Sequence, residues 1–197
     1  MTSVRVEPLT GAALASGLDA LADLRITVFR DWPYLYDGDR AYERRYLEQF
    51  AVAPDAIIVA AFDGERMVGA ATGAAMTGHF EEFAAPFAAR GFDPARIFYC
   101  AESVLLPDYR GRGLGHRFFD EREAHARTLG TYHHAAFCAV IRPDDHPLKP
   151  SGYRPLNAFW AKRGYRPVDG AIAHFAWTDV GEAAETEKPM QFWMKPL

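Results

Sequence analysis

Residues 99–115 read YCAESVLLPDYRGRGLG, an apolar run that ends at Pro107 and is followed by three glycines at alternate positions. The apolar run predicts a strand, and the sequence beyond Gly113 has the apolar spacing of a helix. Glycine lets the backbone adopt positive φ and approach a ligand, and no Ser, Thr, Asp or Asn between Arg110 and Gly115 caps the helix. Because its first amides are left for an external acceptor, the sequence predicts a strand, an anion-binding loop and a helix.

Two common phosphate-binding loops do not fit this spacing. The dinucleotide motif G-x-G-x-x-G, counted from Gly111, needs a third glycine where the chain has His116, and no acidic residue follows about 20 residues on. This disfavours a nucleotide-binding Rossmann protein. A P-loop needs Gly-Lys-Ser/Thr where the chain has His116, Arg117 and Phe118.

The glycine spacing does match the pattern Q/R-x-x-G-x-G/A, through Arg110, Gly113 and Gly115. This pattern is the acetyl-CoA loop of the GNAT superfamily, so the chain resembles a GNAT acyl-CoA N-acyltransferase. The expected order of strands and helices extends the resemblance over nearly the full length. It implies an α/β (α+β) GNAT fold in a single domain, residues 1–197, with a mixed central sheet of about seven strands flanked by helices and a β-α-β acetyl-CoA unit in the middle.

Composition is consistent with one globular domain. The chain has 197 residues, 49% of them hydrophobic and 24% charged. A net charge of -4 without any block of Lys or Arg leads us to expect no nucleic-acid partner. No apolar run reaches the roughly 18 residues of a membrane span and the N-terminus lacks a signal-peptide core, so we expect no membrane partner and a cytoplasmic location. The two cysteines, Cys100 and Cys138, lie in apolar runs and are expected to be buried free thiols.

Hydrophobic periodicity and the positions of Gly and Pro predict the remaining elements. Strands are expected over residues 4–8, 57–62, 67–75, 97–106, 132–141, 165–177 and 190–195, and helices over residues 18–29, 42–50, 79–90, 114–129 and from 156 to just before 164. The helix over residues 79–90 is an addition to the GNAT order. Residues 142–155 contain four prolines and are expected to form an irregular loop, and the Glu-rich residues 181–188 a solvated link.

Acetyl transfer to an amine first needs a neutral nucleophile. An amine with a pKa of about 10.4 is mostly protonated at pH 7, so deprotonating it costs roughly 4 to 5 kcal/mol. Glu102 is the acidic residue nearest the loop on the strand over residues 97–106, where the resemblance implies a general base that acts directly or through water. A surface glutamate, or one paired with an arginine, is the alternative.

The resemblance also implies an acid for the departing thiolate, a tyrosine in a Phe-Tyr pair on the short helix. Here the pair is Phe159-Trp160, and an indole N–H donates a hydrogen bond but has no readily transferable proton. This leaves Tyr153, Tyr165, solvent or no acid at all. For both tyrosines the alternative is packing under the loop.

By the same resemblance, acetyl-CoA is the co-substrate, and backbone amides at a bulge in the strand hold its thioester and pantetheine arm. The predicted cofactor-binding residues are Val104, Leu105, Leu106, Arg110, Gly111, Arg112, Gly113, Leu114, Gly115, His116 and Trp160. We expect no metal, because Asp144-Asp145-His146 has no second histidine or cysteine at ligand spacing.

Acceptor recognition in this family usually falls to the connector between the first two helices and to loops beyond the fifth strand. The corresponding residues are Asp31, Trp32, Tyr34, Tyr36, Asp37, Arg142 and His146. Their aromatic and acidic mixture favours a small-molecule amine with an apolar body, and ordinary core aromatics are the alternative. The expected function is N-acetyl transfer in a ternary complex. A non-catalytic acyl-CoA-binding sensor or regulatory module is the alternative that Trp160 favours, and a homodimer is left open because GNAT proteins are often dimers.

Overall fold

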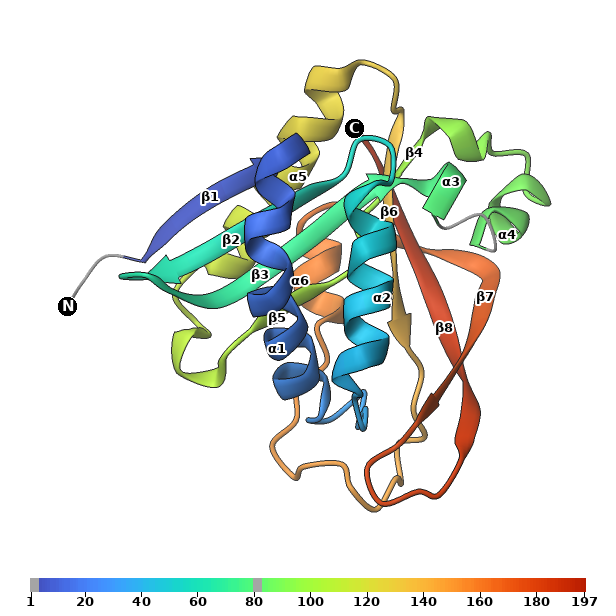
Figure 1. Ribbon diagram of the computed structural model, residues 1–197. Helices are drawn as coiled ribbons and strands as arrows, with labels where there is room; N and C mark the ends of the chain where they lie inside the picture. The colour runs from blue at the N-terminus through green and yellow to red at the C-terminus, as the bar shows by residue number, and fades with distance from the viewer. Residues whose placement is uncertain (1–3, 80–82) are drawn as a thin grey trace.

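The computed structural model describes residues 4–79 and 83–197, which form one eight-stranded mixed sheet (Figure 1). The strand order is β1-β2-β3-β4-β6-β8-β7, and β5 pairs with β3 beside this path. The strands are β1 Arg5–Thr10, β2 Ile57–Asp63, β3 Arg66–Ala75, β4 Ile97–Tyr99, β5 Ser103–Leu105, β6 His134–Val140, β7 Arg166–Thr178 and β8 Glu185–Pro196. The mixed sheet that the sequence predicted is confirmed, and it has one strand more because the central strand is split in two.

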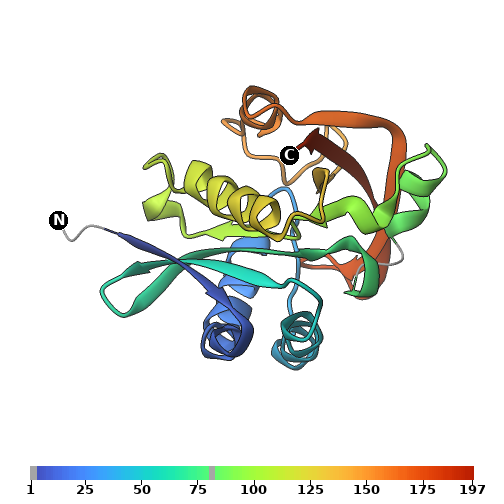
Figure 2. The same cartoon turned by 90° about the horizontal axis from the view of Figure 1, so that it is seen from above.

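Helices cover both faces of the sheet. Figure 2 shows α1 and α2 on one face and α5 and α6 on the other. The α-helices are α1 Leu18–Phe29, α2 Arg40–Ala51, α3 Met76–His79, α4 Ala84–Ala88, α5 Leu114–Leu129 and α6 Asn157–Lys162. The 3-10 helices that lie wholly within the described residues are η1 Gly11–Gly17, η3 Pro94–Arg96 and η4 Pro107–Tyr109. Within the described part of the chain, none of the helices is long and apolar enough to cross a membrane.

Alternation along β2 divides the core into two layers. Ile58 points toward Leu21 and Phe50 of the layer under α1 and α2, whereas Val59 points toward Phe118 of the layer under α5. All five are almost fully buried. Successive side chains of a strand point to opposite faces, so a strand covered on both faces is apolar throughout.

The hairpin and the β-α-β unit that the sequence predicted are confirmed. Strands β2 and β3 pair antiparallel around a turn in which Gly64 has a φ of 60°. Strands β4 and β6 pair parallel, with Phe98 opposite Ala135, and α5 connects them. Helix α5 ends at Gly130, whose φ of 69° is the left-handed conformation that a helix C-terminus favours.

The central strand breaks between β4 and β5. The amide of Ala101 donates to the carbonyl of Thr72 at 3.1 Å, and the amide of Thr72 donates to the carbonyl of Glu102 at 3.0 Å. Two successive residues therefore oppose one residue of β3, which is the arrangement of a β-bulge. The amide of Cys100 still bonds to Ala136 of β6 at 2.8 Å, but β5 pairs only with β3. Strands β5 and β6 consequently diverge beyond the bulge.

A buried arginine on α5 stabilises this break. Arg122 is 1% exposed, and its guanidinium donates to the carbonyls of Thr72 and Glu102, each at 3.0 Å, and to the hydroxyl of Ser103 at 2.9 Å. Both carbonyls already accept from a strand amide, so Arg122 gives each of them a second donor and ties α5 to the bulge.

Three predicted elements differ from the structure. The helix expected over residues 79–90 is described only in part: His79 ends α3, α4 covers Ala84–Ala88 and stops before Arg90, and residues 80–82 lie outside the described residues. Pro86 has no amide to donate, so it is tolerated in the first turn of α4 but not inside a longer helix. Strand β1 continues past Pro8, because an edge strand accommodates proline. Strand β8 begins inside the expected solvated link, and Lys188 there is 4% exposed.

Candidate active site

A cavity of about 1070 Å³ opens where β5 and β6 diverge. The glycine loop lies along one part of it, and Glu102 lies in its wall at the bulge. Aromatic side chains of the α1–α2 connector and of the loop after β6 line another part, among them Trp32, Tyr34 and Tyr153. One cavity therefore joins a candidate anion site, an ionisable side chain and an apolar wall.

The glycine loop has the conformation that an anion site requires. Gly111 and Gly113 have φ values of 75° and 80°, and no atom of the described residues lies within 4 Å of a Cβ built on either. Gly113 is the N-cap of α5, and no side chain caps the helix. The amides of His116 and Arg117 bond back to the Gly113 carbonyl, so the amides before them point out of the helix terminus toward an external acceptor.

The structure brings most of the predicted cofactor-binding residues to the cavity. Those that line it are Leu105, Arg110, Gly111, Gly113, Gly115, His116 and Trp160. Arg112 does not line it, because its guanidinium donates to the Asp108 carbonyl at 2.6 Å and lies over the ring of Tyr109. Leu114 is 5% exposed and packs into the core instead.

The predicted amide contacts along β5 need a correction. The amide of Leu106 donates to the Val68 carbonyl at 3.0 Å, and Val104 pairs with Ala70 in the same ladder. Alternate residues of an antiparallel strand direct their backbone groups to the same neighbour, so Val104 and Leu106 are turned toward β3. Leu105 faces the opposite side, where β6 has diverged, and it lines the cavity.

Glu102 is buried, ion-paired and part of the cavity wall. It is 7% exposed, and its Oε2 lies 2.6 Å from a guanidinium nitrogen of Arg25 on α1. Arg25 also pairs with Glu43 of α2. Oε1 of Glu102 has no hydrogen-bond partner among residues 4–79 and 83–197. The carboxylate is thus held from one side by Arg25 and has a second oxygen without a protein partner.

Arg25 was not singled out from the sequence, where it appears only as a polar position in an apolar helix pattern. Burial by itself lowers the pKa of Arg25, but the charge of Glu102, together with Tyr46 and Glu43, outweighs burial and raises this pKa above its usual range. The guanidinium therefore remains charged and fixes the orientation of the Glu102 carboxylate.

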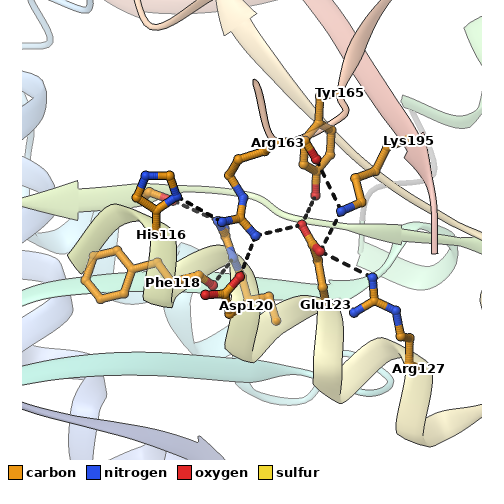
Figure 3. A network of polar contacts seen from close by, with 10 residues as sticks. His116, Phe118, Asp120, Glu123, Arg127, Arg163, Tyr165 and Lys195 are labelled. Carbon is orange, nitrogen blue, oxygen red and sulfur yellow. Dashed lines mark hydrogen bonds and ion pairs between the residues drawn. The ribbon is translucent and has the colours of Figure 1, made fainter. Parts of the chain in front are cut away.

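The two candidate acid tyrosines lie in different places. Tyr153 lines the cavity, with its ring 5.9 Å from that of Trp32 in an edge contact. Burial raises the pKa of Tyr153, so its hydroxyl is protonated at neutral pH. Tyr165 is fully buried outside the cavity lining, and its hydroxyl donates to Glu123 at 3.1 Å (Figure 3). Tyr165 is therefore not brought to the site, contrary to the prediction.

Trp160 stands in the cavity wall at the position of the expected tyrosine. Its ring lies 5.0 Å from Phe137 and 5.3 Å from Trp193. Both partners come from strands of the sheet, β6 and β8. Trp160 is thus a packed wall residue whose aromatic face borders the cavity.

Three of the predicted acceptor-binding residues line the cavity, namely Trp32, Tyr34 and Arg142. The others, Asp31, Tyr36, Asp37 and His146, do not. The backbone of Tyr36 forms an isolated antiparallel β-bridge with that of Asp179. Asp37 forms an exposed ion pair with Arg30 at 2.7 Å. The ring of His146 lies 4.9 Å from that of Trp32, and its Nδ1 accepts from the Leu148 amide at 3.2 Å. His146 thus supports the aromatic wall from behind.

Arg142 belongs to an ion cluster that we call the Asp179 clamp, made of Arg142, Asp179 and Lys188. Two guanidinium nitrogens of Arg142 lie 2.6 and 3.0 Å from the Asp179 carboxylate, and Lys188 lies 3.2 Å from it. Arg142 also donates to the carbonyls of Pro33 at 2.9 Å and Tyr34 at 2.6 Å. Its donors are engaged by the protein, so Arg142 holds the acceptor wall rather than offering a free charge.

The clamp also sets the ionisation of Asp179. Burial favours a higher pKa, but the hydrogen bonds and charges of Arg142 and Lys188 outweigh it and lower the pKa of Asp179 below its usual value. Sequence reasoning missed both Asp179 and Lys188. Asp179 directly follows β7 and Lys188 lies in β8, and neither carries a local pattern that distinguishes it from a solvated charge.

Both cysteines are buried free thiols, as the sequence predicted. Both also line the cavity. Burial raises the pKa of the Cys138 thiol to about 12 and also raises that of Cys100. Sγ of Cys138 lies 2.9 Å from the hydroxyl of Tyr99. Because the thiolate is the nucleophilic form of cysteine, neither side chain is activated for attack at neutral pH. No cluster of three metal-ligating side chains occurs in the described ranges of the chain.

Comparison with known proteins adds to this geometry. The sequence model of the acetyltransferase (GNAT) family matches residues 21–149, more than half of the chain. No curated protein sequence matches it. Among solved structures, an acetyltransferase from Thermus thermophilus is similar with 18% identity and a TM-score of 0.58, over 100% of this chain and 98% of that one.

Two further structures share the fold at low identity. The ribosomal-protein-alanine N-acetyltransferase of Brucella melitensis has 15% identity and a TM-score of 0.62, over 98% of this chain and 99% of that one. Arabidopsis thaliana NAA60, solved in complex with a bisubstrate analogue, has 12% identity and a TM-score of 0.61, over 98% of each chain.

Proposed function

The chain belongs to the acetyltransferase (GNAT) family, and from this premise we propose that it transfers the acetyl group of acetyl-CoA to the amine of a small-molecule acceptor by direct attack in a ternary complex. One observation carries the proposal: a single cavity is lined both by the open glycine loop and by Glu102. The unpaired amides at the start of α5 suit the diphosphate of CoA, and the cavity-facing backbone of Leu105 suits its pantetheine arm. The thioester of acetyl-CoA supplies an activated acetyl group.

In this proposal Glu102 is the general base. The proton of the acceptor ammonium passes to its carboxylate, directly or through one water, and the neutral nitrogen attacks the thioester carbonyl carbon. The C–S bond then breaks, the thiolate leaves, and the nitrogen releases its second proton to solvent, which gives the neutral amide. Oε1 is buried and has no hydrogen-bond partner in the described part of the chain, and it is the oxygen that we propose receives the proton, while Arg25 holds Oε2.

Tyr153 is the group proposed to act on the leaving thiolate. It lines the cavity and is protonated at neutral pH, so it donates a hydrogen bond to developing negative charge. Replacing Tyr153 with phenylalanine is expected to lower kcat by about tenfold, which corresponds to one hydrogen bond to a charged group. Steady-state kinetics with saturating acetyl-CoA measures the effect.

The matched control for Tyr153→Phe is Tyr165→Phe, which removes the same hydroxyl outside the cavity. Without the Tyr165 hydroxyl, the Glu123 carboxylate loses one hydrogen-bond donor, so the variant is expected to lose thermal stability without a fall in kcat. If Tyr153→Phe retains the full kcat of the parent protein, the leaving thiolate is protonated by solvent.

Direct transfer is favoured over an acetyl-cysteine intermediate because both cavity thiols are held protonated. The variant Cys138→Ser keeps a hydroxyl beside Tyr99 and removes the thiol. It is expected to retain most of its kcat. Intact-protein mass spectrometry after mixing with acetyl-CoA alone should show no acetyl addition to the parent protein; an acetylated Cys138 would overturn direct transfer.

The proposed acceptor is a monoamine with an apolar, preferably aromatic, body. Glu102 and Asp144 are the acidic residues among the described cavity-lining residues, and Asp144 is already paired with Lys149 at 2.8 Å. Of the basic residues that line the cavity, Arg142 and Lys149 are likewise paired, with Asp179 and Asp144, and the others are Arg110, Arg122 and Arg154. A polyamine would therefore meet more positive than negative charge, whereas Trp32 and Tyr34 provide apolar surface.

The test is release of CoA thiol from acetyl-CoA over a panel of aromatic monoamines, polyamines and peptides. Turnover with aromatic monoamines supports the proposal.

Trp160 favours a second candidate, an acyl-CoA-binding module without catalysis, because it replaces the expected acid. Tight binding of acetyl-CoA by calorimetry, with no turnover on any acceptor, identifies this second function, and absence of binding contradicts both.

A further inference from the structure

Arg163, at the C-terminal end of α6, connects this helix to the first turns of α5 (Figure 3). One guanidinium nitrogen lies 3.1 Å from Nδ1 of His116, and another lies 2.6 Å from Asp120 and 3.4 Å from Glu123. The Arg163 side chain is 11% exposed and its guanidinium lies over the ring of Phe119 at 5.1 Å. Arg163 is thus fixed by three contacts on α5 besides the one with His116.

The contact with His116 determines where that ring carries its proton. A guanidinium has only donors, so Nδ1 of His116 accepts, and an imidazolium has no lone pair at Nδ1 with which to accept. The ring is therefore neutral with its proton on Nε2. No group in the described part of the chain is bonded to Nε2, and His116 is exposed in the cavity lining. A directed N–H donor is left at the edge of the glycine loop.

The position of His116 on α5 aims this donor at the anion site. His116 is the third residue of the helix, and helical side chains lean back toward the helix N-terminus. That terminus is where the glycine loop leaves its amides free. The ring of Phe159 lies 4.8 Å from that of His116 and restricts its rotation from the other side.

We propose that Arg163 is a positioning residue that holds His116 in the Nε2–H form, so that His116 donates a hydrogen bond to a phosphate oxygen of CoA. The inference rests on the proposed function, because it takes CoA as the ligand. The donor is neutral and needs no protonation to act. Its effect is on CoA affinity and not on the acetyl-transfer step.

Glu123 holds this arrangement in place. It is 3% exposed, and its carboxylate accepts from Tyr165 at 3.1 Å and from Lys195 at 2.7 Å (Figure 3). Arg127 lies 3.4 Å from the same carboxylate. Tyr165 directly precedes β7, Lys195 lies in β8 and Arg127 lies in α5, so the carboxylate that contacts Arg163 is itself held by three parts of the fold.

The test measures the dissociation constant of CoA by calorimetry for a pair of isosteric variants. The amide of glutamine places a donor near the position of Nε2, whereas that of asparagine places one near Nδ1. His116→Asn is expected to weaken CoA binding by about tenfold or more, the effect of one hydrogen bond to a charged group. His116→Gln is expected to bind CoA within about threefold of the parent protein, since it keeps a donor.

A double-mutant cycle tests whether Arg163 affects CoA binding by positioning His116 or only by its positive charge. Arg163→Met is expected to weaken CoA binding severalfold in the parent protein and to have no further effect in the His116→Asn background. Arg127→Met removes another cation that contacts the Glu123 carboxylate but leaves the contact of His116 with Arg163 in place, so it should leave CoA affinity unchanged. Equal losses from Arg163→Met in both backgrounds would mean that Arg163 acts through its charge alone and would overturn the proposal.

A spectroscopic measurement on the unaltered protein does not depend on the folding of any variant. Nitrogen NMR of labelled histidine should show His116 with an unprotonated Nδ1 and a protonated Nε2, both free and with CoA. A ring protonated at Nδ1 overturns the proposal. If the parent protein does not bind CoA at all, the proposed function fails, whereas CoA binding that is unaffected by His116→Asn contradicts only this inference.

Discussion

Replacing Glu102 with glutamine is expected to lower kcat by about a hundredfold or more, with the dissociation constant of acetyl-CoA unchanged. The amide cannot accept the ammonium proton, so the acceptor amine stays charged and unreactive. The dissociation constant should not change because the substitution lies in the bulge, whereas the free amides proposed to bind CoA lie at the start of α5. Kinetics at saturating acceptor and calorimetry with acetyl-CoA give the two quantities.

The chain offers a matched control in Glu43→Gln. Glu43 is fully buried and bonded to the same guanidinium of Arg25, but it does not line the cavity. Both variants remove one carboxylate from Arg25, so both are expected to lower the free energy of unfolding, and only Glu102→Gln should lower kcat strongly. Equal losses of kcat in the two variants would show that Glu102 acts through the packing of Arg25 and not as a base.

The glycine loop was predictable because its determinants are local. Gly111 and Gly113 need positive φ, and the absence of a capping side chain before α5 is visible in the same few residues. A pattern that depends only on neighbours in the chain can be interpreted without a fold. The parallel pair β4 and β6 followed from the helix between two apolar runs for the same reason.

The surroundings of Glu102 were not predictable in this way. The bulge depends on Thr72 across the sheet and on Arg122 from α5, and the carboxylate is oriented by Arg25 from α1. None of these partners is a sequence neighbour of Glu102. Of the alternatives left open for this residue, the structure shows a glutamate paired with an arginine, and because the pair uses Oε2 and leaves Oε1 without a partner among the described residues, the role of Glu102 as a base stays a prediction.

The direction in which a side chain points decides what Tyr165 and Arg142 contact. Tyr165 directly follows the short helix that the family motif marks, but its hydroxyl points to Glu123 inside the core. Arg142 was expected to meet the acceptor, but its guanidinium is held by Asp179 from a distant turn. A motif places a residue near a site, and only the packing of other elements decides which way its side chain points.

Replacing Asp179 with asparagine is expected to lower the free energy of unfolding by about 3 to 5 kcal/mol, because it leaves Arg142 and Lys188 as buried cations without a counter-charge. Asp179 is 8% exposed and Lys188 is 4% exposed, so solvent screens this repulsion little. The acceptor KM should rise as well, since Arg142 fixes the carbonyls of Pro33 and Tyr34 in the cavity wall. Affinity for acetyl-CoA should stay unchanged.

The difference between the parent protein and Asp179→Asn should depend on pH in a defined direction. The folded-state pKa of Asp179 lies below its ordinary value of 3.8, so the stabilisation is fully present above pH 3.8 and is lost as the pH falls through the folded-state pKa. Denaturant unfolding at neutral pH and at progressively lower pH should therefore show the two proteins converging in acid. A difference that grows in acid would contradict the ion cluster as the source of stability.

Asp37→Asn is the control for the same chemical change at an exposed pair. Asp37 and Arg30 lie 2.7 Å apart, but their side chains are 50% and 55% exposed, so their interaction is screened by water. We expect this variant to lose no more than about 1 kcal/mol and to keep the acceptor KM of the parent protein. If the two aspartate variants were equally stable, burial would not set the strength of the clamp, and the acceptor wall would have to be held mainly by the aromatic contacts around Trp32 and Tyr34.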